Sequence, residues 1–271
     1  MIKSRIAMVL VLVFAVTGAL QAHDLFLRLD SFFVEPGTQA RIRVLNGTFS
    51  KSENAVTRVR LRDLSVVSPE GTSHPDTTTW SARGDTSIFT VATGRAGTYV
   101  VGASLLPSQI TLKAKDFNTY LASDGIPDVL AARRRSGQLE KDATEKYAKH
   151  VKALIQVGAE RTPGFDTVLG YPAELVPLNN PYGSRPGGWL RVRAIVDGKP
   201  VPNQLIVSGG RPPRGGRLPV RSVRTDSEGV ARIRISERGQ WYVKFIHMAP
   251  VSGDAALDYE SKWATLTFQV R

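Results

Sequence analysis

The amino-acid sequence of 271 residues contains no cysteine. Disulfide bonds, cysteine-ligated zinc or iron–sulfur centres and thiol catalysis are therefore all excluded. Familiar catalytic motifs are missing too: the sequence has no nucleophile elbow, no P-loop, no glycine-rich dinucleotide fingerprint and no His-Glu-x-x-His pair. We therefore predict that the protein is not an enzyme.

Long hydrophobic runs are also lacking. The longest, Ile6 to Val16, has about half of the ~20 residues that a membrane-spanning helix needs. It follows the basic residues Lys3 and Arg5 and precedes a group of mostly small residues ending at Ala22, which is the pattern of a secretory signal peptide. We predict a signal peptide over residues 1–22 and a periplasmic location for the mature protein.

The expected cleavage site would place a histidine at the new N-terminus. Cleavage after Ala22 makes His23 the first residue, although Leu20 is larger than the residue usually found at that position of the motif. Cleavage after Ala19 is the alternative, and it would leave three residues in front of the histidine. We favour Ala22 because the small-residue rule is obeyed only loosely.

Acidic residues are few relative to basic ones. The chain has 36 Lys and Arg against 24 Asp and Glu, and the 249 residues after position 22 carry a net charge of +10. Basic clusters at Arg133–Arg135 and in the loop 211–217 invite a nucleic-acid interpretation. Export separates the protein from cellular nucleic acid, so we predict no such partner and favour attraction to anionic surfaces of the cell envelope.

The residue pattern predicts a mainly β protein with two β-sandwich units and an inserted α-helical hairpin. Residues 23–112 contain short alternating segments such as 39–44, separated by Gly- and Pro-rich turns, and predict the N-terminal unit. Residues 166–271 return to this pattern, for example in 190–196, and predict the C-terminal unit. Residues 113–165 differ in character and predict a helical insertion.

Two helices are expected in this insertion. Pro127 fits the first turn of a helix that ends before Gly137. Asp142 can cap a second helix that is stopped by Gly158. The expected apolar face of this second helix is made of residues at helical spacing, namely Ala143, Tyr147, Val151 and Leu154.

His23 is the most informative of the four histidines, which include His74 and His150 and stand at no metal-ligand spacing to one another. As a mature N-terminus, His23 offers its amine and its imidazole Nδ1, which can close a chelate ring on one cation. A metal can displace both protons near neutral pH, because an α-amine has a pKa of about 7.7–8.0 and an imidazole of about 6.5. We expect His74 and His150 to have no ligand role.

His247 is the second candidate ligand. It ends the strand-like segment 241–246, where it could equally be a histidine at the rim of the core. Asp258 and Glu260 follow and could return beside it as oxygen donors if the last segment forms the neighbouring strand. Met248 is the only methionine left after processing, so the predicted metal ligands are nitrogen and oxygen atoms of His23, His247, Glu260 and Asp258.

Four stretches of the chain resemble a family of bacterial periplasmic proteins of otherwise unknown function that are linked to nickel or cobalt uptake. They are Ala22–Leu27 with Pro36-Gly37 after it, Asp116–Leu121 with Val129–Arg134, Leu169–Leu178, and Trp241–Val243 with Ile246–Met248 and Asp258–Phe268. Together they span nearly the whole mature chain. At the end motif the usual aromatic positions are filled by Tyr259 and Lys262, which leaves Glu260 and Trp263 in place.

This resemblance implies a metal-handling component that supplies, or senses for, an importer in the inner membrane. It also implies that the C-terminal half is similar to transthyretin-like or carboxypeptidase-regulatory β-sandwiches, and the turn Thr225-Asp226 to Gly229 fits that pattern.

We therefore predict a periplasmic binding protein for a divalent transition metal, Ni(II) or Co(II), with Cu(II) compatible with the same donors. The alternative is a non-enzymatic scaffolding or adhesion protein of the envelope, which predicts salt-sensitive association with membranes or proteins and no tight metal binding. A copper oxidase with an N-terminal histidine shares the amine–imidazole chemistry but lacks an identifiable second motif.

Overall fold

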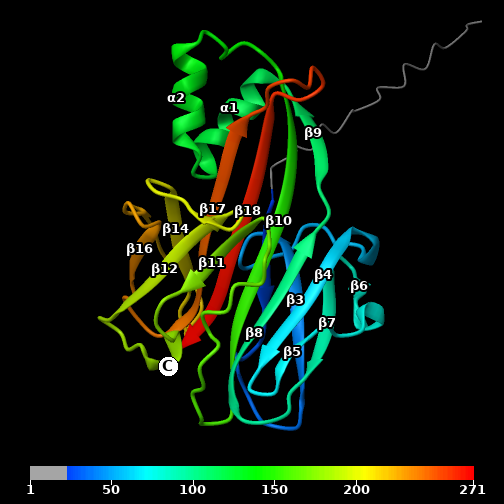
Figure 1. Cartoon of the computed structure of the whole chain (residues 1–271), viewed down its shortest axis with the longest axis vertical. Helices are drawn as coiled ribbons and strands as arrows, with labels where there is room; N and C mark the ends of the chain where they lie inside the picture. Colours follow the sequence, from blue (N-terminus) through cyan, green and yellow to red (C-terminus); the bar gives the residue numbers. More distant parts are fainter. Residues whose placement is uncertain (1–22) are drawn as a thin grey trace, which may run out of the picture.

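The computed structural model describes residues 23–271, so the predicted signal peptide lies outside the described residues. The fold is mainly β with a pair of α-helices, which confirms the fold class in its coarse form. None of the helices among residues 23–271 is long and apolar enough to cross a membrane. The strands form three open sheets (Figure 1).

The central sheet has ten strands and joins the two ends of the chain. Its main path runs β15 (Leu218–Arg224), β14 (Leu205–Arg211), β17 (Gly239–Pro250), β18 (Tyr259–Val270), β10 (Ala143–Val157), β8 (Gly97–Leu105), β4 (Leu61–Ser68) and β5 (Gly71–Ser73). Two more strands, β2 (Phe33–Val34) and β9 (Ser108–Leu112), also pair with β10. Strand β10 runs parallel to β18 and antiparallel to β8, so it connects strands from both predicted β units into one sheet.

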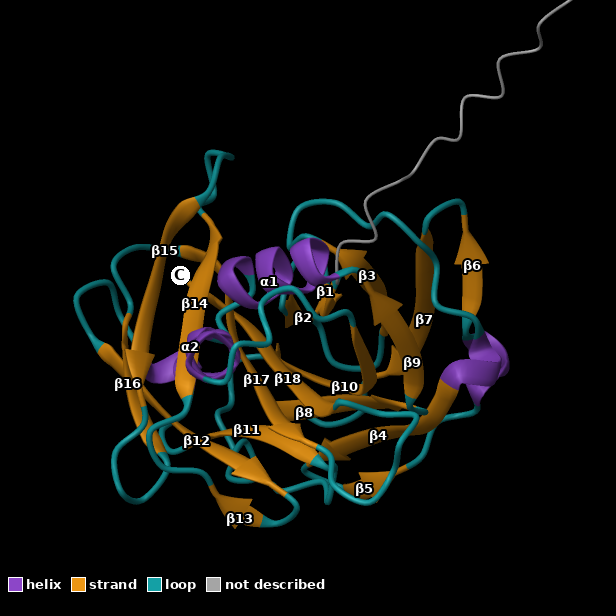
Figure 2. Ribbon diagram, turned by 90° about the horizontal axis from the view of Figure 1, so that it is seen from above, coloured by secondary structure: helices purple, strands orange, loops and turns teal. Residues whose placement is uncertain are grey.

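A four-stranded sheet packs against each face of the central sheet (Figure 2). On one face lies the sheet of β1 (Asp24–Arg28), β3 (Gln39–Gly47), β7 (Thr86–Ala92) and β6 (Ser81–Arg83). On the other lies the sheet of β11 (Ala173–Pro177), β12 (Trp189–Val196), β13 (Lys199–Pro200) and β16 (Val230–Arg234). Short 3₁₀ turns occur at Arg58–Arg60, Thr77–Thr79 and Pro181–Gly183.

Each face of the central sheet therefore carries its own hydrophobic core. Along β10 the side chains alternate between these cores: Val151 and Ile155 pack toward β1, whereas Leu154 packs toward β11 and β12. Because β10 is covered on both faces, its last nine residues are all buried, and they include the polar residues Lys152 and Gln156.

The prediction of a second helix over this segment is wrong, because residues 143–157 form strand β10. Ala143, Tyr147 and Val151 are spaced by four residues, and this spacing places side chains on one face of a helix and also on one face of a strand. Leu154 is the residue that distinguishes the two, since it lies on the opposite face of β10 from Val151. Long-range pairing with β18 decided the outcome.

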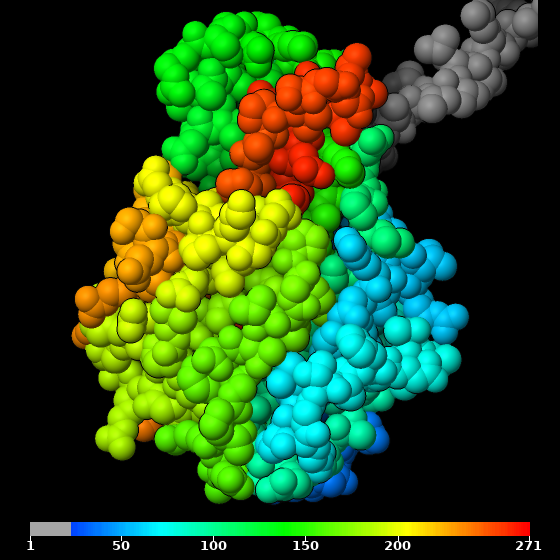
Figure 3. Space-filling model, in the orientation of Figure 1, coloured from blue at the N-terminus to red at the C-terminus, as the bar shows by residue number. Residues whose placement is uncertain are grey.

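The helical pair is formed instead by α1 (Ala114–Ser123) and α2 (Pro127–Arg135). The prediction of a helix beginning at Pro127 is confirmed, and Gly137 follows it with a left-handed φ of 68°. Figure 3 shows the pair as a projection at one end of the molecule, beside the 251–258 connection.

One arginine of the family-like stretches joins the two helices to each other and to the connection that follows them. The guanidinium of Arg133 is buried, lies 4.9 Å from the ring centre of Phe117 and donates to Asn118 Oδ1 at 3.1 Å. It also donates to the main-chain oxygens of Gln138, at 2.7 Å, and Lys141. Arg133 in this stretch therefore has a structural role.

Candidate functional site

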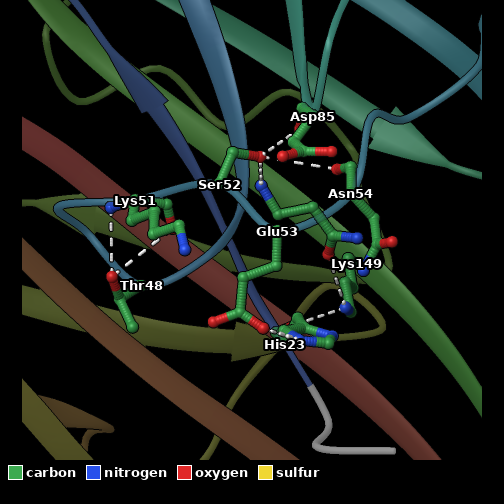
Figure 4. A network of polar contacts seen from close by, with 9 residues as sticks. His23, Thr48, Lys51, Ser52, Glu53, Asn54, Asp85 and Lys149 are labelled. Atoms are coloured by element: carbon green, nitrogen blue, oxygen red, sulfur yellow. Dashed lines mark hydrogen bonds and ion pairs between the residues drawn. The ribbon is translucent and has the colours of Figure 1, made fainter. Parts of the chain in front are cut away.

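His23 is held in place at the start of β1. Its main-chain oxygen accepts a hydrogen bond from the Lys149 ammonium of β10, which also donates to Asn46 Oδ1 at 3.3 Å. Its imidazole Nε2 lies 2.5 Å from Glu53 Oε2 (Figure 4). Glu53 is positioned by its own main-chain N–H, which donates to Asn46 O at 2.9 Å. Both the main chain and the ring of His23 are therefore fixed by partners from distant parts of the sequence.

The contact with Glu53 selects one form of the imidazole. When the ring is neutral, the carboxylate accepts the Nε2 proton, so Nδ1 carries the lone pair. Nδ1 is the nitrogen that can close a chelate ring with the α-amine of the same residue. A carboxylate on the remote ring nitrogen is the usual support of a metal-binding histidine, because it fixes the tautomer and makes the ligand more basic.

A cavity of about 230 Å³ opens beside this histidine. One wall is a cluster of three aromatic rings, Phe26, Phe49 and Tyr242, whose centroids lie 5.1–5.3 Å apart. The rim is polar and includes His23 and Glu53. The cavity therefore combines an apolar wall with an imidazole at its edge.

Two further carboxylates line the same cavity and share one lysine. Lys244 Nζ lies 2.5 Å from Asp24 Oδ2 and 3.8 Å from Asp124 Oδ1. The other oxygen of Asp24, Oδ1, is buried and has no hydrogen-bond partner among residues 23–271. Burial, opposed in part by Lys244, raises the pKa of Asp124 to about 6, and burial lowers the pKa of Lys149 to about 8. The charged residues that line the cavity are thus three carboxylates, Asp24, Glu53 and Asp124, and one arginine, Arg217.

We expect Asp124→Asn to stabilise the protein at neutral pH. Because the pKa of Asp124 is raised in the folded protein, its protonated form stabilises the fold. This stabilisation is fully present below a pH of about 3.9, the pKa of Asp in the unfolded chain, and is lost as the pH rises through about 6. Asparagine keeps the shape without the charge, so the free energy of unfolding should rise by about 2–3 kcal/mol at pH 7.5. Urea unfolding at pH 7.5 and pH 4.0 measures this; a gain of equal size at both pH values would contradict it.

His247, the second predicted ligand, lies on the other face of the central sheet. On β17, Lys244 and Tyr242 point toward β1, whereas Trp241, Val243 and Phe245 alternate with them and pack in the opposite core. His247 belongs to this second set by the two-residue period of a strand. Its Nδ1 lies 3.0 Å from Gln204 Oε1, and burial, followed by the charge of Lys262, lowers its pKa.

The two predicted carboxylate ligands have other partners. Asp258 Oδ2 accepts from the main-chain N–H of Thr144 at 2.8 Å, and Lys141 Nζ lies 3.2 Å from its Oδ1, so it joins the 251–258 connection to β10. Glu260 forms an ion pair with Lys146 at 3.4 Å. It shares the face of His247, since it stands diagonally across the β17–β18 ladder from it.

The structure therefore does not bring the four predicted ligands together. His23 is separated from His247 and Glu260 by the central sheet. Within residues 23–271 no three side chains of His, Cys, Asp or Glu are grouped so as to hold a metal ion. The residues that do surround His23, namely Glu53, Asp24 and Asp124, were missed because only the tertiary structure places them there. Asp24 alone had a signal, its position directly after the histidine.

Comparison with known proteins gives a family and no characterised relative. The family model described as "Domain of unknown function (DUF4198)" matches residues 20–249. No curated protein matches the chain.

Proposed function

The chain belongs to the family described as a domain of unknown function (DUF4198), and from this premise we propose that it is an exported protein that binds a divalent transition metal, nickel or cobalt, through His23. The metal is cargo for uptake, and its receiver is an importer of the inner membrane. The observation that carries the proposal is the contact of His23 Nε2 with Glu53, which leaves Nδ1 available beside the α-amine.

The chelate needs cleavage directly before His23, a site outside the described residues. An amine and Nδ1 on one residue then provide two nitrogen donors in a fixed arrangement, since Lys149 holds the main-chain oxygen of the same residue. Two nitrogen donors favour the late first-row ions in the order Co(II), Ni(II), Cu(II). Copper is the strongest binder on chemistry alone, and the resemblance described above is the reason for naming nickel or cobalt.

One residue fills only part of the coordination shell of a metal ion. The His23 side chain is 19% exposed and stands at the rim of a cavity, so water or a donor of a partner protein can occupy the remaining positions. An open site of this kind suits an ion that is handed on, whereas a structural metal site is closed by protein ligands. The proposal therefore favours transfer to an importer over storage.

The test is calorimetric titration of Ni(II), Co(II), Cu(II) and Zn(II) into protein that begins at His23. We expect His23→Ala to abolish binding and acetylation of the His23 α-amine to do the same, because the chelate then loses one of its two nitrogen donors. Glu53→Gln should weaken binding about 10–100-fold, since it removes the carboxylate that supports the ring.

His247→Ala is the matched control and should leave the affinity unchanged, because this histidine lies on the other face of the sheet. Equal affinity of the acetylated protein would overturn the chelate. Loss of binding in His247→Ala at unchanged stability would restore the ligand set expected from the sequence.

A further inference from the structure

A second cavity, of about 390 Å³, lies at the other end of β10 from the helical pair. The end of β10, the last residues of β18 and the turn Pro181–Gly183 surround it. Its wall includes Phe33, Tyr182, Ser184 and three arginines, Arg161, Arg185 and Arg271. It shares no residue with the cavity beside His23.

The charged side chains that line this cavity are all positive. Three guanidinium groups contribute to it, and none of the lining residues is Asp or Glu. In the part of the chain that the structure describes, none of the three arginines forms an ion pair with a carboxylate side chain. Concave sites lined by charges of one sign concentrate the field and attract ions of the opposite sign.

The aromatic residues of the wall, Tyr182 and Phe33, are held by hydrogen bonds and by contact with an arginine. The Tyr182 hydroxyl donates to Leu154 O at 2.5 Å, and Asn180 Oδ1 accepts from the Tyr182 main-chain N–H at 3.0 Å. The guanidinium carbon of Arg271 lies 3.6 Å from the ring centre of Phe33, which orients this arginine on an apolar surface. These contacts hold Tyr182 and Arg271 in place in the wall of the cavity.

One buried hydroxyl group of a wall residue makes no hydrogen bond within the described residues 23–271. Ser184 Oγ is buried and has no hydrogen-bond partner among residues 23–271. An unpartnered buried hydroxyl costs free energy, so such a group in a native structure calls for an explanation. Ser184 is one of the residues that line the cavity, and a change of its side-chain rotamer would turn the hydroxyl toward an anion bound there.

We propose that this cavity binds a small organic anion with two or more carboxylate or phosphate groups. Three separate guanidinium groups suit a ligand with several negative groups better than a ligand with one, because each guanidinium can make charge-assisted hydrogen bonds to a different oxyanion. The volume of about 390 Å³ also exceeds what a single small inorganic anion fills, and Phe33 provides an apolar surface for a carbon skeleton. The site is independent of the proposed metal function, because the two cavities have no residue in common.

The test is calorimetric titration of citrate, pyrophosphate and inorganic phosphate into the protein at low salt. Citrate or pyrophosphate should bind with an affinity that falls as salt is added, and phosphate should bind more weakly. Arg161→Gln with Arg185→Gln should lower the affinity about tenfold or more for each arginine. Ser184→Ala should weaken binding while the free protein becomes no less stable.

The matched control removes two exposed arginines elsewhere. Arg191→Gln with Arg232→Gln changes the outer face of β12 and β16 and gives the same net charge, so it should leave citrate binding intact. Equal loss in both double variants would overturn the site in favour of overall charge. Binding to vesicles of anionic phospholipid without any binding of the soluble anions would also overturn it. His23→Ala should leave anion binding unchanged, which separates this result from the metal proposal.

Discussion

Glu174→Leu is expected to lower the free energy of unfolding by about 3–5 kcal/mol, the usual effect of leaving one member of a buried ion pair without its partner. Glu174 forms an ion pair with Lys152, and their side chains are only 1% and 3% exposed. The same carboxylate accepts hydrogen bonds from the main-chain N–H groups of Leu169, at 2.9 Å, and Tyr171, at 2.8 Å. The substitution therefore strands a buried ammonium and two main-chain donors together.

Lys152→Met should cost less than Glu174→Leu, because Glu174 then keeps its two main-chain donors. The double variant should be less damaging than the sum of the single ones, since neither charge is left alone. Urea unfolding followed by tryptophan fluorescence measures all three. A loss below about 1 kcal/mol for Glu174→Leu would show that water reaches the lysine and that the pair is not buried in solution.

The second large effect is a loss of stability in acid that depends on His150. This side chain is 2% exposed, its Nδ1 lies 2.9 Å from Ser104 Oγ, and its Nε2 has no hydrogen-bond partner within residues 23–271. Burial, followed by the positive charge of Arg62, lowers its pKa to about 4. The neutral ring therefore contributes fully to the free energy of unfolding above a pH of about 6.5, the pKa of histidine in the unfolded chain. This contribution is lost as the pH falls toward 4.

The expected size of this loss is about 3 kcal/mol between pH 7.5 and pH 4. His150→Asn removes the titrating group and keeps a polar atom near Ser104, so the difference in stability between the two pH values should shrink by that amount. Any packing loss from the smaller side chain is the same at both pH values and cancels. His247→Asn is the matched control and should shrink the difference less, because that ring is only partly buried. An unchanged difference in His150→Asn would contradict the prediction.

The family-like stretches illustrate what a motif does and does not indicate. In Leu169–Leu178 the polar residue Glu174 anchors a loop and a buried lysine, and in Val129–Arg134 the polar residue Arg133 anchors the helical pair. Both are structural roles. The first stretch differs, since His23 and Asp24 line a cavity and Asp24 Oδ1 has no hydrogen-bond partner within residues 23–271. A resemblance alone does not separate these cases, because a charged residue in such a stretch can serve packing or binding.

The sequence by itself determined the features that depend on neighbouring residues. Alternation of apolar and polar side chains indicated strands over much of the chain, and Pro127 with Gly137 marked α2. The absence of cysteine limited the metal chemistry, and the donor atoms of His23 follow from the residue type alone.

Only the tertiary structure decided which strands pair and which face of a sheet each side chain meets. A two-residue period tells that Lys244 and His247 point to opposite faces of β17, but it does not tell which face β1 covers. Glu53 reaches His23 because a loop closes from 30 residues away, and β10 is a strand because β18 pairs with it from more than 100 residues away. Contacts between residues so distant in the chain depend on the packing of the whole protein. The pattern of neighbouring residues therefore does not predict them.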